Sequence, residues 1–267
     1  MNDRVKTELR DGVAYVTLNR ADKFNGLDWD MLQGLVAAAR AVRQDRSVRA
    51  VILQGAGPAF CAGLDFGSFS KTPVRMIRGF LKYGVKSTNL FQEACWCWRE
   101  LPVPVLVVLH GRCYGGGMQI ALAADFRFAT PDCELSILEA KWGLVPDMTG
   151  TVTLRELVPI DVAKRLTMTG VMFSGTEAKA MNLVTEVAED PLAAAEALVA
   201  QLKARSPDSV AATKSLFQQT WAVSVNAAFA IESRIQRILI MGRNHKIART
   251  ANFKKVAPEF VDRSFED

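Results

Sequence analysis

The chain has 267 residues, of which 49% are hydrophobic and 23% charged, a balance typical of a globular protein with a full core. Its longest apolar run, residues 103–109, is too short to cross a bilayer, and the N-terminal sequence lacks the apolar segment of a secretory signal, so we expect a cytoplasmic protein without a membrane partner. The net charge of +5 comes from scattered lysines and arginines without a basic run or a nucleic-acid motif, which argues against a nucleic-acid partner.

The cysteines and histidines give no pattern of metal ligands. Cys95 and Cys97 form only a C-x-C pair, and the two histidines, His110 and His245, lie far apart in the sequence. An odd number of cysteines without a signal peptide predicts reduced, buried thiols. We therefore interpret Cys61 as a packing residue and not as a nucleophile.

The N-terminal part of the chain predicts a hairpin followed by a helix. Residues 6–9 and 13–18 flank the dipeptide Asp11-Gly12, which is a signal for a two-residue hairpin turn. Asp28 is the expected cap of a helix with apolar residues at helical spacing, namely Leu32, Leu35, Val36, Ala39 and Val42.

A buried strand and an aromatic segment follow. Residues 48–54 form an apolar run that predicts the strand, and a glycine-punctuated loop comes next, at residues 55–67. Residues 70–100 carry many aromatic side chains, including Tyr83, and show helical character from about Leu90. We expect the CWCW segment within them to pack mainly in the core.

The second half of the chain alternates strands with helices and ends in helices alone. Strands are predicted at residues 103–109, 125–129 and 183–187, and helices at residues 118–124, 149–157, 161–169, 175–181, 192–204, 209–221 and 225–240. The alternation predicts an α/β core over residues 1–190, and residues 191–267 form a helical C-terminal region.

The stretch from residue 102 to residue 124 has the order strand, glycine-rich turn, helix, and residues 115–117 are all glycine. Glycines let the main chain approach a bound group, and the start of a helix leaves N–H groups unpaired, so this arrangement favours a negatively charged oxygen. Two carboxylates, Glu139 and Asp147, follow in the sequence. Donors for an oxyanion next to acid/base groups are what proton transfer beside a carbonyl requires.

A second stretch, AFCAGLDF at residues 59–66, also follows a strand-like run and has a glycine, Gly63, at the strand end. An isolated glycine run is more simply explained as a tight turn. Two strand ends with exposed N–H groups, however, can supply a pair of donors to one oxygen. The two stretches together therefore predict an oxyanion site.

Four motifs in order resemble the crotonase superfamily, also called the enoyl-CoA hydratase/isomerase family. They are LNRADKFNGLDWDM, FCAGLD, HGRCYGGGMQIALAADFRFAT and EAKWGLVPD. The resemblance implies an α/β fold, a crotonase-like spiral of repeated ββα units followed by a C-terminal helical trimerisation region. It also implies an acyl-CoA substrate and assembly as a homotrimer or a dimer of trimers.

By this resemblance, two backbone N–H groups bind the thioester oxygen of acyl-CoA and stabilise an enolate. The first belongs to Leu64, which follows the glycine of the FCAGLD motif, and the second belongs to Gly116, the middle glycine of the triplet. A donor aimed at charge that develops in the transition state is worth roughly 3 kcal/mol.

Hydratases of this family hold and activate a water with two glutamates, and the matching positions here are Gln119 and Glu139. A glutamine can hydrogen-bond a water but has no proton to exchange near neutral pH. Dienoyl-CoA isomerases of the family have a glutamate and an aspartate that match Glu139 and Asp147, with a third carboxylate where this chain has Gln119. Enoyl-CoA isomerases can work with a single carboxylate.

Asp147 has two compatible interpretations, a catalytic carboxylate or the cap of the helix that begins near Thr149. A family dehalogenase uses an aspartate nucleophile at the position of Asp147. That enzyme also needs a histidine base on the helix before the central strand, and the matching residues 90–100 contain no histidine. It also has a tryptophan where this chain has Glu139, so dehalogenation is not expected.

The resemblance implies a groove for the nucleotide and pantetheine parts of coenzyme A. The matching residues are Lys23, Phe24, Gly26, Ala62, Asp65 and Phe66, and Lys255 could reach a phosphate. Apart from coenzyme A as part of the substrate, no cofactor and no metal are expected.

The resulting expectation is enolate chemistry on an acyl-CoA thioester, with isomerisation of a double bond ahead of hydration. In this scheme Glu139 is the base, with Asp147 and Gln119 beside it. The alternatives are an enoyl-CoA hydratase with an atypical Gln119 site, and a non-catalytic relative that binds acyl-CoA or RNA.

Overall fold

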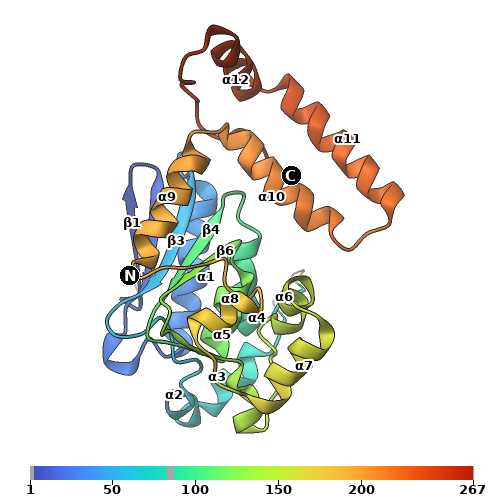
Figure 1. Cartoon of the computed structure of the whole chain (residues 1–267). Coiled ribbons are helices and arrows are strands. Elements are labelled where there is room, and N and C mark those ends of the chain that lie inside the picture. The colour runs from blue at the N-terminus through green and yellow to red at the C-terminus, as the bar shows by residue number, and fades with distance from the viewer. Residues whose placement is uncertain (1–2, 83–86, 267) are drawn as a thin grey trace.

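The computed structural model describes residues 3–82 and 87–266. Its centre is a six-stranded sheet in the order β1-β2-β3-β4-β6-β8 (Figure 1). The strands are β1 (Val5–Arg10), β2 (Val13–Leu18), β3 (Ala50–Gly55), β4 (Val105–Leu109), β6 (Phe126–Ala129) and β8 (Glu186–Val187). β1 and β2 are antiparallel, and the turn between them has Asp11 and Gly12 at positive φ, which confirms the predicted hairpin. The other strand pairs are parallel.

A second, smaller sheet runs beside the first and makes the fold a spiral. β5 (Arg112–Tyr114) and β7 (Glu134–Ser136) pair in parallel, and a single bridge adds Cys61 next to Cys113. Along the chain, β4 of the large sheet is followed by β5 of the small one, and β6 by β7. This repetition is the spiral of ββα units that the crotonase resemblance implies, and the predicted fold class is confirmed.

Helical segments connect and follow the strands of this part of the chain. They are η1 (Ala21–Lys23), α1 (Trp29–Gln44), α2 (Phe66–Ser70), α3 (Pro73–Gly79), α4 (Leu90–Arg99), α5 (Gly116–Ala123), η2 (Leu138–Trp142), α6 (Gly150–Leu157), α7 (Ile160–Thr169) and α8 (Gly175–Ala180). The Asp28 carboxylate accepts a hydrogen bond from the Met31 N–H at 2.8 Å, so the predicted cap of α1 is confirmed. Within the described residues, no helix has the length and apolar character needed to span a membrane.

The main core lies between the sheet and helices α1, α4 and α5. In the CWCW segment of α4, Cys95, Cys97 and Trp98 are buried in this core, as predicted. Tyr83, from the same aromatic region, lies outside the described residues. α5 is buried along its whole length, and it begins at Gly116, two residues before the predicted start. Gly116 and Gly117 are poor helix formers and lie before the apolar pattern from which the helix was predicted, so the predicted helix starts two residues too late.

The last four helices divide into two groups. They are α9 (Pro191–Lys203), α10 (Pro207–Thr220), α11 (Val225–Met241) and α12 (Arg243–Lys254), of which α12 was not predicted. α9 covers the second face of the large sheet. α10 and α11 share a small separate core with Phe265 of the C-terminal tail, and α10, α11 and α12 extend beyond the sheet (Figure 1). The predicted boundary at residue 190 therefore marks the change from alternating strands and helices to helices alone. α9, the first helix after this boundary, still packs on the sheet.

A buried lysine fastens α10 to the α/β core. The Nζ atom of Lys214 lies 2.7 Å from a carboxylate oxygen of Asp125 and donates to the carbonyl of Val103 at 3.0 Å. Gln218, one turn later, donates to the carbonyl of Arg99 at 2.8 Å. These contacts fix the first helix of the C-terminal group against the ends of α4 and β4.

A second polar cluster fixes the C-terminal tail, and Asp208 is its centre. Its carboxylate accepts hydrogen bonds from the N–H groups of Ser264 and Phe265, at 2.6 and 2.7 Å, and from the Asn244 amide at 2.9 Å. Burial raises the pKa of Asp208, but these hydrogen bonds outweigh it and hold the pKa below its ordinary value. The ionised carboxylate therefore stabilises the folded tail.

We expect Asp208→Asn to lower the free energy of unfolding by about 2–4 kcal/mol, because an amide cannot accept all these hydrogen bonds. The loss should be full at neutral pH. It should shrink as the pH falls through the depressed pKa of Asp208, since protonation removes the same interaction from the wild type. Urea unfolding between neutral and acidic pH measures this. Asp262→Asn, an exposed change in the same tail, is the control, and equal stability of the two variants would contradict the assignment.

Candidate active site

The two predicted oxyanion segments lie side by side. Leu27 pairs with Leu64 in a parallel bridge, and the Leu27 N–H donates to the Gly63 carbonyl at 2.8 Å. Gly63 has φ of +88°, and a Cβ atom added there would lie 2.8 Å from the Tyr114 carbonyl oxygen and 3.6 Å from the Gly116 nitrogen. The residue before Leu64 thus contacts the first turn of α5.

Neither proposed donor has an acceptor within the described part of the chain. Among the described residues, no hydrogen bond runs from the N–H of Leu64 or of Gly116 to a protein acceptor. Gly116 is the first residue of α5, where the N–H groups have no acceptor within the helix. Both groups therefore remain available to a ligand oxygen.

Glu139 lies directly against the glycine triplet. It belongs to the short helix η2, and its carboxylate oxygens would be 3.5 and 3.9 Å from a Cβ atom at Gly115. The side chain is 91% buried, and its Oε2 atom has no hydrogen-bond partner within the described chain. Burial, together with the nearby charge of Asp147, raises the pKa of Glu139 above its ordinary value, although the Gln119 amide opposes this rise. A buried carboxylate of this kind is suited to proton transfer near neutral pH.

Gln119 is buried on α5, one turn after Gly116, and the structure places both ends of its amide in hydrogen bonds. Its oxygen accepts from the N–H groups of Met148 and Gly150, at 2.8 and 2.9 Å. Its Nε2 atom donates to Glu139 Oε1 at 2.6 Å. The sequence placed Gln119 at the site but gave no indication of these partners.

The interpretation of Asp147 as a helix cap is wrong. The N-cap of α6 is Thr149, and among the described residues the Asp147 carboxylate accepts no N–H group of this helix. Instead, the Gln119 oxygen accepts the N–H of Gly150, the first residue of α6. Asp147 lies exposed on the preceding turn, and the partial burial of its carboxylate by neighbouring protein atoms raises its pKa. Its charge acts on Glu139 and on Cys95, so it lies at the same site.

The structure brings six of the seven predicted coenzyme A residues onto two facing loops. The N–H of Gly26 donates to the Lys23 carbonyl and that of Ala62 to the Phe24 carbonyl, both at 2.9 Å. A Cβ atom at Gly26 would lie 3.7 Å from that of Asp65. Phe66 follows Asp65 directly at the start of α2. The seventh residue, Lys255, ends α12 at the opposite end of the molecule from α2 (Figure 1).

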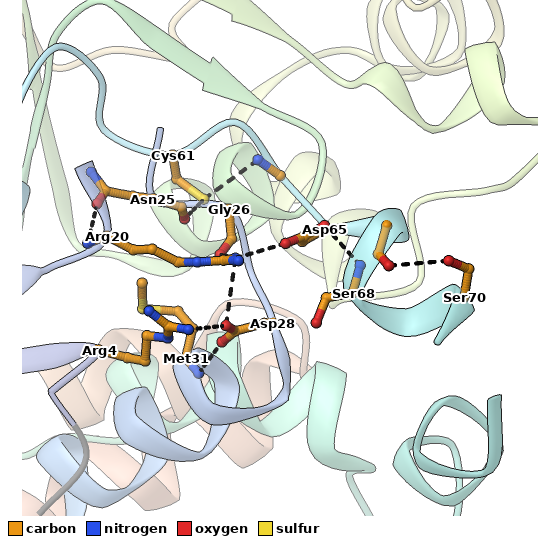
Figure 2. A network of polar contacts seen from close by, with 12 residues as sticks. Arg4, Arg20, Asn25, Gly26, Asp28, Met31, Cys61, Asp65, Ser68 and Ser70 are labelled. Carbon is orange, nitrogen blue, oxygen red and sulfur yellow. Dashed lines mark hydrogen bonds and ion pairs between the residues drawn. The ribbon is translucent and has the colours of Figure 1, made fainter. Parts of the chain in front are cut away.

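An ion-pair network that the sequence did not reveal holds these loops together (Figure 2). Arg20 donates to the Gly26 carbonyl at 3.0 Å and to the Asp65 carboxylate at 2.8 Å. Asp65 also accepts the Ser68 N–H and so caps α2. The buried side chain of Asn25 donates to the carbonyls of Ala56 and Ala59. Arg20 and Asn25 stand within the first motif of the resemblance, and that was the available signal for them.

Two further side chains complete the description of the site. Cys61 is fully buried, and burial raises the pKa of its thiol to about 12, which agrees with a packing role. Trp142, three residues after Glu139, packs against Phe66 with the two rings tilted and their centroids 4.6 Å apart. This aromatic contact joins the segment that carries Glu139 to the loop that carries Leu64.

Comparisons with known proteins show what this chain resembles in sequence and in fold. The sequence model for enoyl-CoA hydratase/isomerase matches residues 8–263. An enoyl-CoA hydratase of Mycobacterium tuberculosis is 30% identical over 258 residues, which cover 96% of each chain. The peroxisomal Delta(3,5)-Delta(2,4)-dienoyl-CoA isomerase of Arabidopsis thaliana is 27% identical, covering 96% of this chain and 95% of its own. The crystal structure of an enoyl-CoA hydratase from Mycobacterium marinum has a TM-score of 0.85 at 30% identity, covering 97% of this chain and 98% of that one.

Proposed function

Because the chain belongs to the enoyl-CoA hydratase/isomerase family, we propose that it moves a double bond within an enoyl- or dienoyl-CoA thioester. The observation that carries this proposal is the hydrogen bonding of Gln119. Its oxygen already accepts two backbone N–H groups, so it is not free to accept a hydrogen bond from a substrate water. Hydration by a pair of carboxylates would need a second carboxylate at the position of Gln119, and this chain has none there. Isomerisation needs no water.

In the proposed reaction the N–H groups of Leu64 and Gly116 bind the thioester oxygen. Oε2 of Glu139 removes a proton from the α-carbon, and the electron pair of that bond enters a dienolate whose oxygen is held by the two donors. The proton then returns from Oε2 to the γ-carbon, and the carbonyl re-forms. The double bond has moved by one position, and no co-reactant, cofactor or metal is consumed.

The role of Asp147 divides this proposal into two schemes. If Glu139 acts alone, it carries one proton between two carbons of an enoyl chain. If Asp147 takes part, the two carboxylates share proton transfers along a longer, dienoyl chain. The raised pKa values of both groups are compatible with either scheme.

The second candidate is hydration at an atypical site, because most of the named relatives are hydratases. A non-catalytic relative that binds acyl-CoA or RNA is the remaining alternative. Ultraviolet absorbance of 2-enoyl-, 3-enoyl- and dienoyl-CoA incubated with the protein separates these functions. Isomerisation changes the absorbance because it moves the double bond into or out of conjugation. Hydration removes the absorbance of a 2-enoyl thioester. No change with any of the three thioesters would contradict the enzymatic proposal.

For the substrate carrier we propose the two facing loops as the coenzyme A site, with Lys23 and Phe24 at its edge. Phe24 is partly exposed, and the guanidinium carbon of Arg112 lies over its ring, 4.8 Å from the ring centroid. The net charge of +5 suits the phosphates of coenzyme A. Lys255 can join a site of this kind only in an assembly of several chains.

We predict that the protein assembles as a trimer or a dimer of trimers. A cavity of about 1070 Å³ lies between the C-terminal helices and the core, and its lining includes apolar side chains from both, such as Leu157 and Phe217, beside charged ones such as Arg127. Large apolar residues of α10–α12 are also exposed in the single chain, including Phe217, Trp221, Phe229 and Phe253. Light scattering at micromolar concentration should give three or six times the mass of the chain, and a stable monomer would refute the prediction.

A further inference from the structure

The orientation of the Gln119 amide follows from its partners. The backbone N–H groups of Met148 and Gly150 can only donate, so the atom that faces them, at 2.8 and 2.9 Å, must be the amide oxygen. The NH₂ group therefore faces Glu139 Oε1, at 2.6 Å. An exchange of the two amide atoms would set donors against donors and leave Oε1 facing an oxygen.

This orientation makes the two oxygens of Glu139 unequal. Oε1 accepts a hydrogen bond from Gln119, so a proton placed there would meet the amide hydrogen. Oε2 is buried and, among the described residues, has no hydrogen-bond partner. A buried carboxylate oxygen without a partner is rare in native structures and calls for an explanation.

We propose that Gln119 is a positioning residue, which holds Glu139 through Oε1 and leaves Oε2 as the one oxygen that exchanges a proton with the acyl chain. This inference rests on the proposed function and deepens it. If the same oxygen removes and returns the proton, both transfers take place on one face of the acyl chain. Rotation of the carboxylate is prevented by the amide.

The same amide joins three parts of the site. Gln119 lies one helical turn after Gly116 on α5, its Nε2 holds Glu139 on η2, and its oxygen holds the turn between Asp147 and α6. A Cβ atom at Gly150 would lie 2.8 Å from the Gln119 oxygen, so the backbone of α6 closes tightly over the amide. The oxyanion donor, the base and the turn that carries Asp147 are thus positioned by one side chain.

The ionisable groups that act on Glu139 come from two further elements. Asp147 approaches from the turn before α6 and raises the pKa of Glu139. Cys95 on α4 also interacts with Glu139, but burial raises its pKa well above the ordinary value, so the thiol stays neutral. The Gln119 amide opposes the rise in the pKa of Glu139. Loss of this donor should therefore raise the pKa further.

The test measures the protonation of Glu139 without a substrate. The infrared C=O band of the protonated carboxyl is titrated with pH and assigned by its absence in Glu139→Gln. In Gln119→Met we expect the titration midpoint to rise by about one pH unit, because a hydrogen bond to the charged form is lost. In Gln119→Glu the two N–H groups keep an acceptor, so folding is preserved. The midpoint should rise further, because a second carboxylate then faces Oε1.

Thr153→Val is the matched control, because the Thr153 hydroxyl donates to the carbonyls of Thr149 and Gly150 at the start of α6 and has no hydrogen bond to Glu139 within the described chain. It should lower the melting temperature and leave the Glu139 titration unchanged. Unchanged midpoints in both Gln119 variants would overturn the proposal. Shifted midpoints support it, and the acid limb of kcat/KM should then rise by the same amount. Shifted midpoints in a protein that turns over none of the thioesters would instead reject the proposed function and retain the positioning role.

Discussion

Replacing Glu139 by glutamine is expected to lower kcat/KM for 3-enoyl-CoA by about 100-fold or more, the usual loss for a general base. Glutamine has nearly the same shape and can still accept the Gln119 hydrogen bond, so the change removes the base and keeps the geometry. Stopped-flow absorbance with 3-enoyl- and dienoyl-CoA measures the effect. Turnover close to wild type would show that Glu139 is not the base.

The same variant should be at least as stable as the wild type at neutral pH. The pKa of Glu139 is raised in the folded protein, so its contribution to stability is complete below the unfolded pKa of a glutamate and is lost as the pH rises through the folded pKa. Glutamine stays neutral and avoids this loss. A melting temperature that is unchanged or raised, together with lost turnover, would separate catalysis from folding.

Asp147→Asn distinguishes the two schemes within the proposed function. Removal of a negative charge near Glu139 should lower the pKa of Glu139 and move the acid limb of the pH profile downward. If Glu139 acts alone, 3-enoyl-CoA turnover should stay within about 10-fold of wild type. If both carboxylates transfer protons, dienoyl-CoA turnover should fall as far as in Glu139→Gln.

The strands and the longer helices could be predicted because their apolar periodicity agrees with their burial. The strand at residues 103–109, the helix α1 with its cap at Asp28 and the helix α9 are such cases. The short helices α2 and α3 were missed, since five to seven residues give too little periodicity. α12 was missed because its sequence is largely polar, and it is a helix through its packing on α10 and α11.

The candidate site was predicted as a set of positions and not as a set of contacts. Leu64, Gly116 and Glu139 could be named from motifs, because backbone donors and a carboxylate leave a local signal. The partners of Gln119 lie 20 to 31 residues further along the chain, and only the tertiary fold brings them together. For the same reason a local helix cap was one of the two interpretations of Asp147, although the acceptor at the start of α6 comes from α5.

Gly63→Ala is expected to lower kcat by about 100-fold, a loss comparable to that of one oxyanion donor. Gly63 has φ of +88°, where an alanine is strained, and its Cβ atom would lie 2.8 Å from the Tyr114 carbonyl oxygen. That oxygen is part of the backbone and cannot move aside cheaply. The loop must therefore shift, and the next residue along it is Leu64, whose N–H is the proposed donor.

Gly67→Ala is the matched control in the same segment, because Gly67 lacks a positive φ and a Cβ there would meet only Asp65 Oδ1 within 4 Å, at 3.4 Å. Its kcat should stay close to wild type. For Gly63→Ala the loss should appear in kcat, with little change in the affinity for coenzyme A alone, because the N–H group acts on the charge of the enolate. Equal kcat values for the two variants would show that the loop at Gly63 does not hold an oxyanion donor.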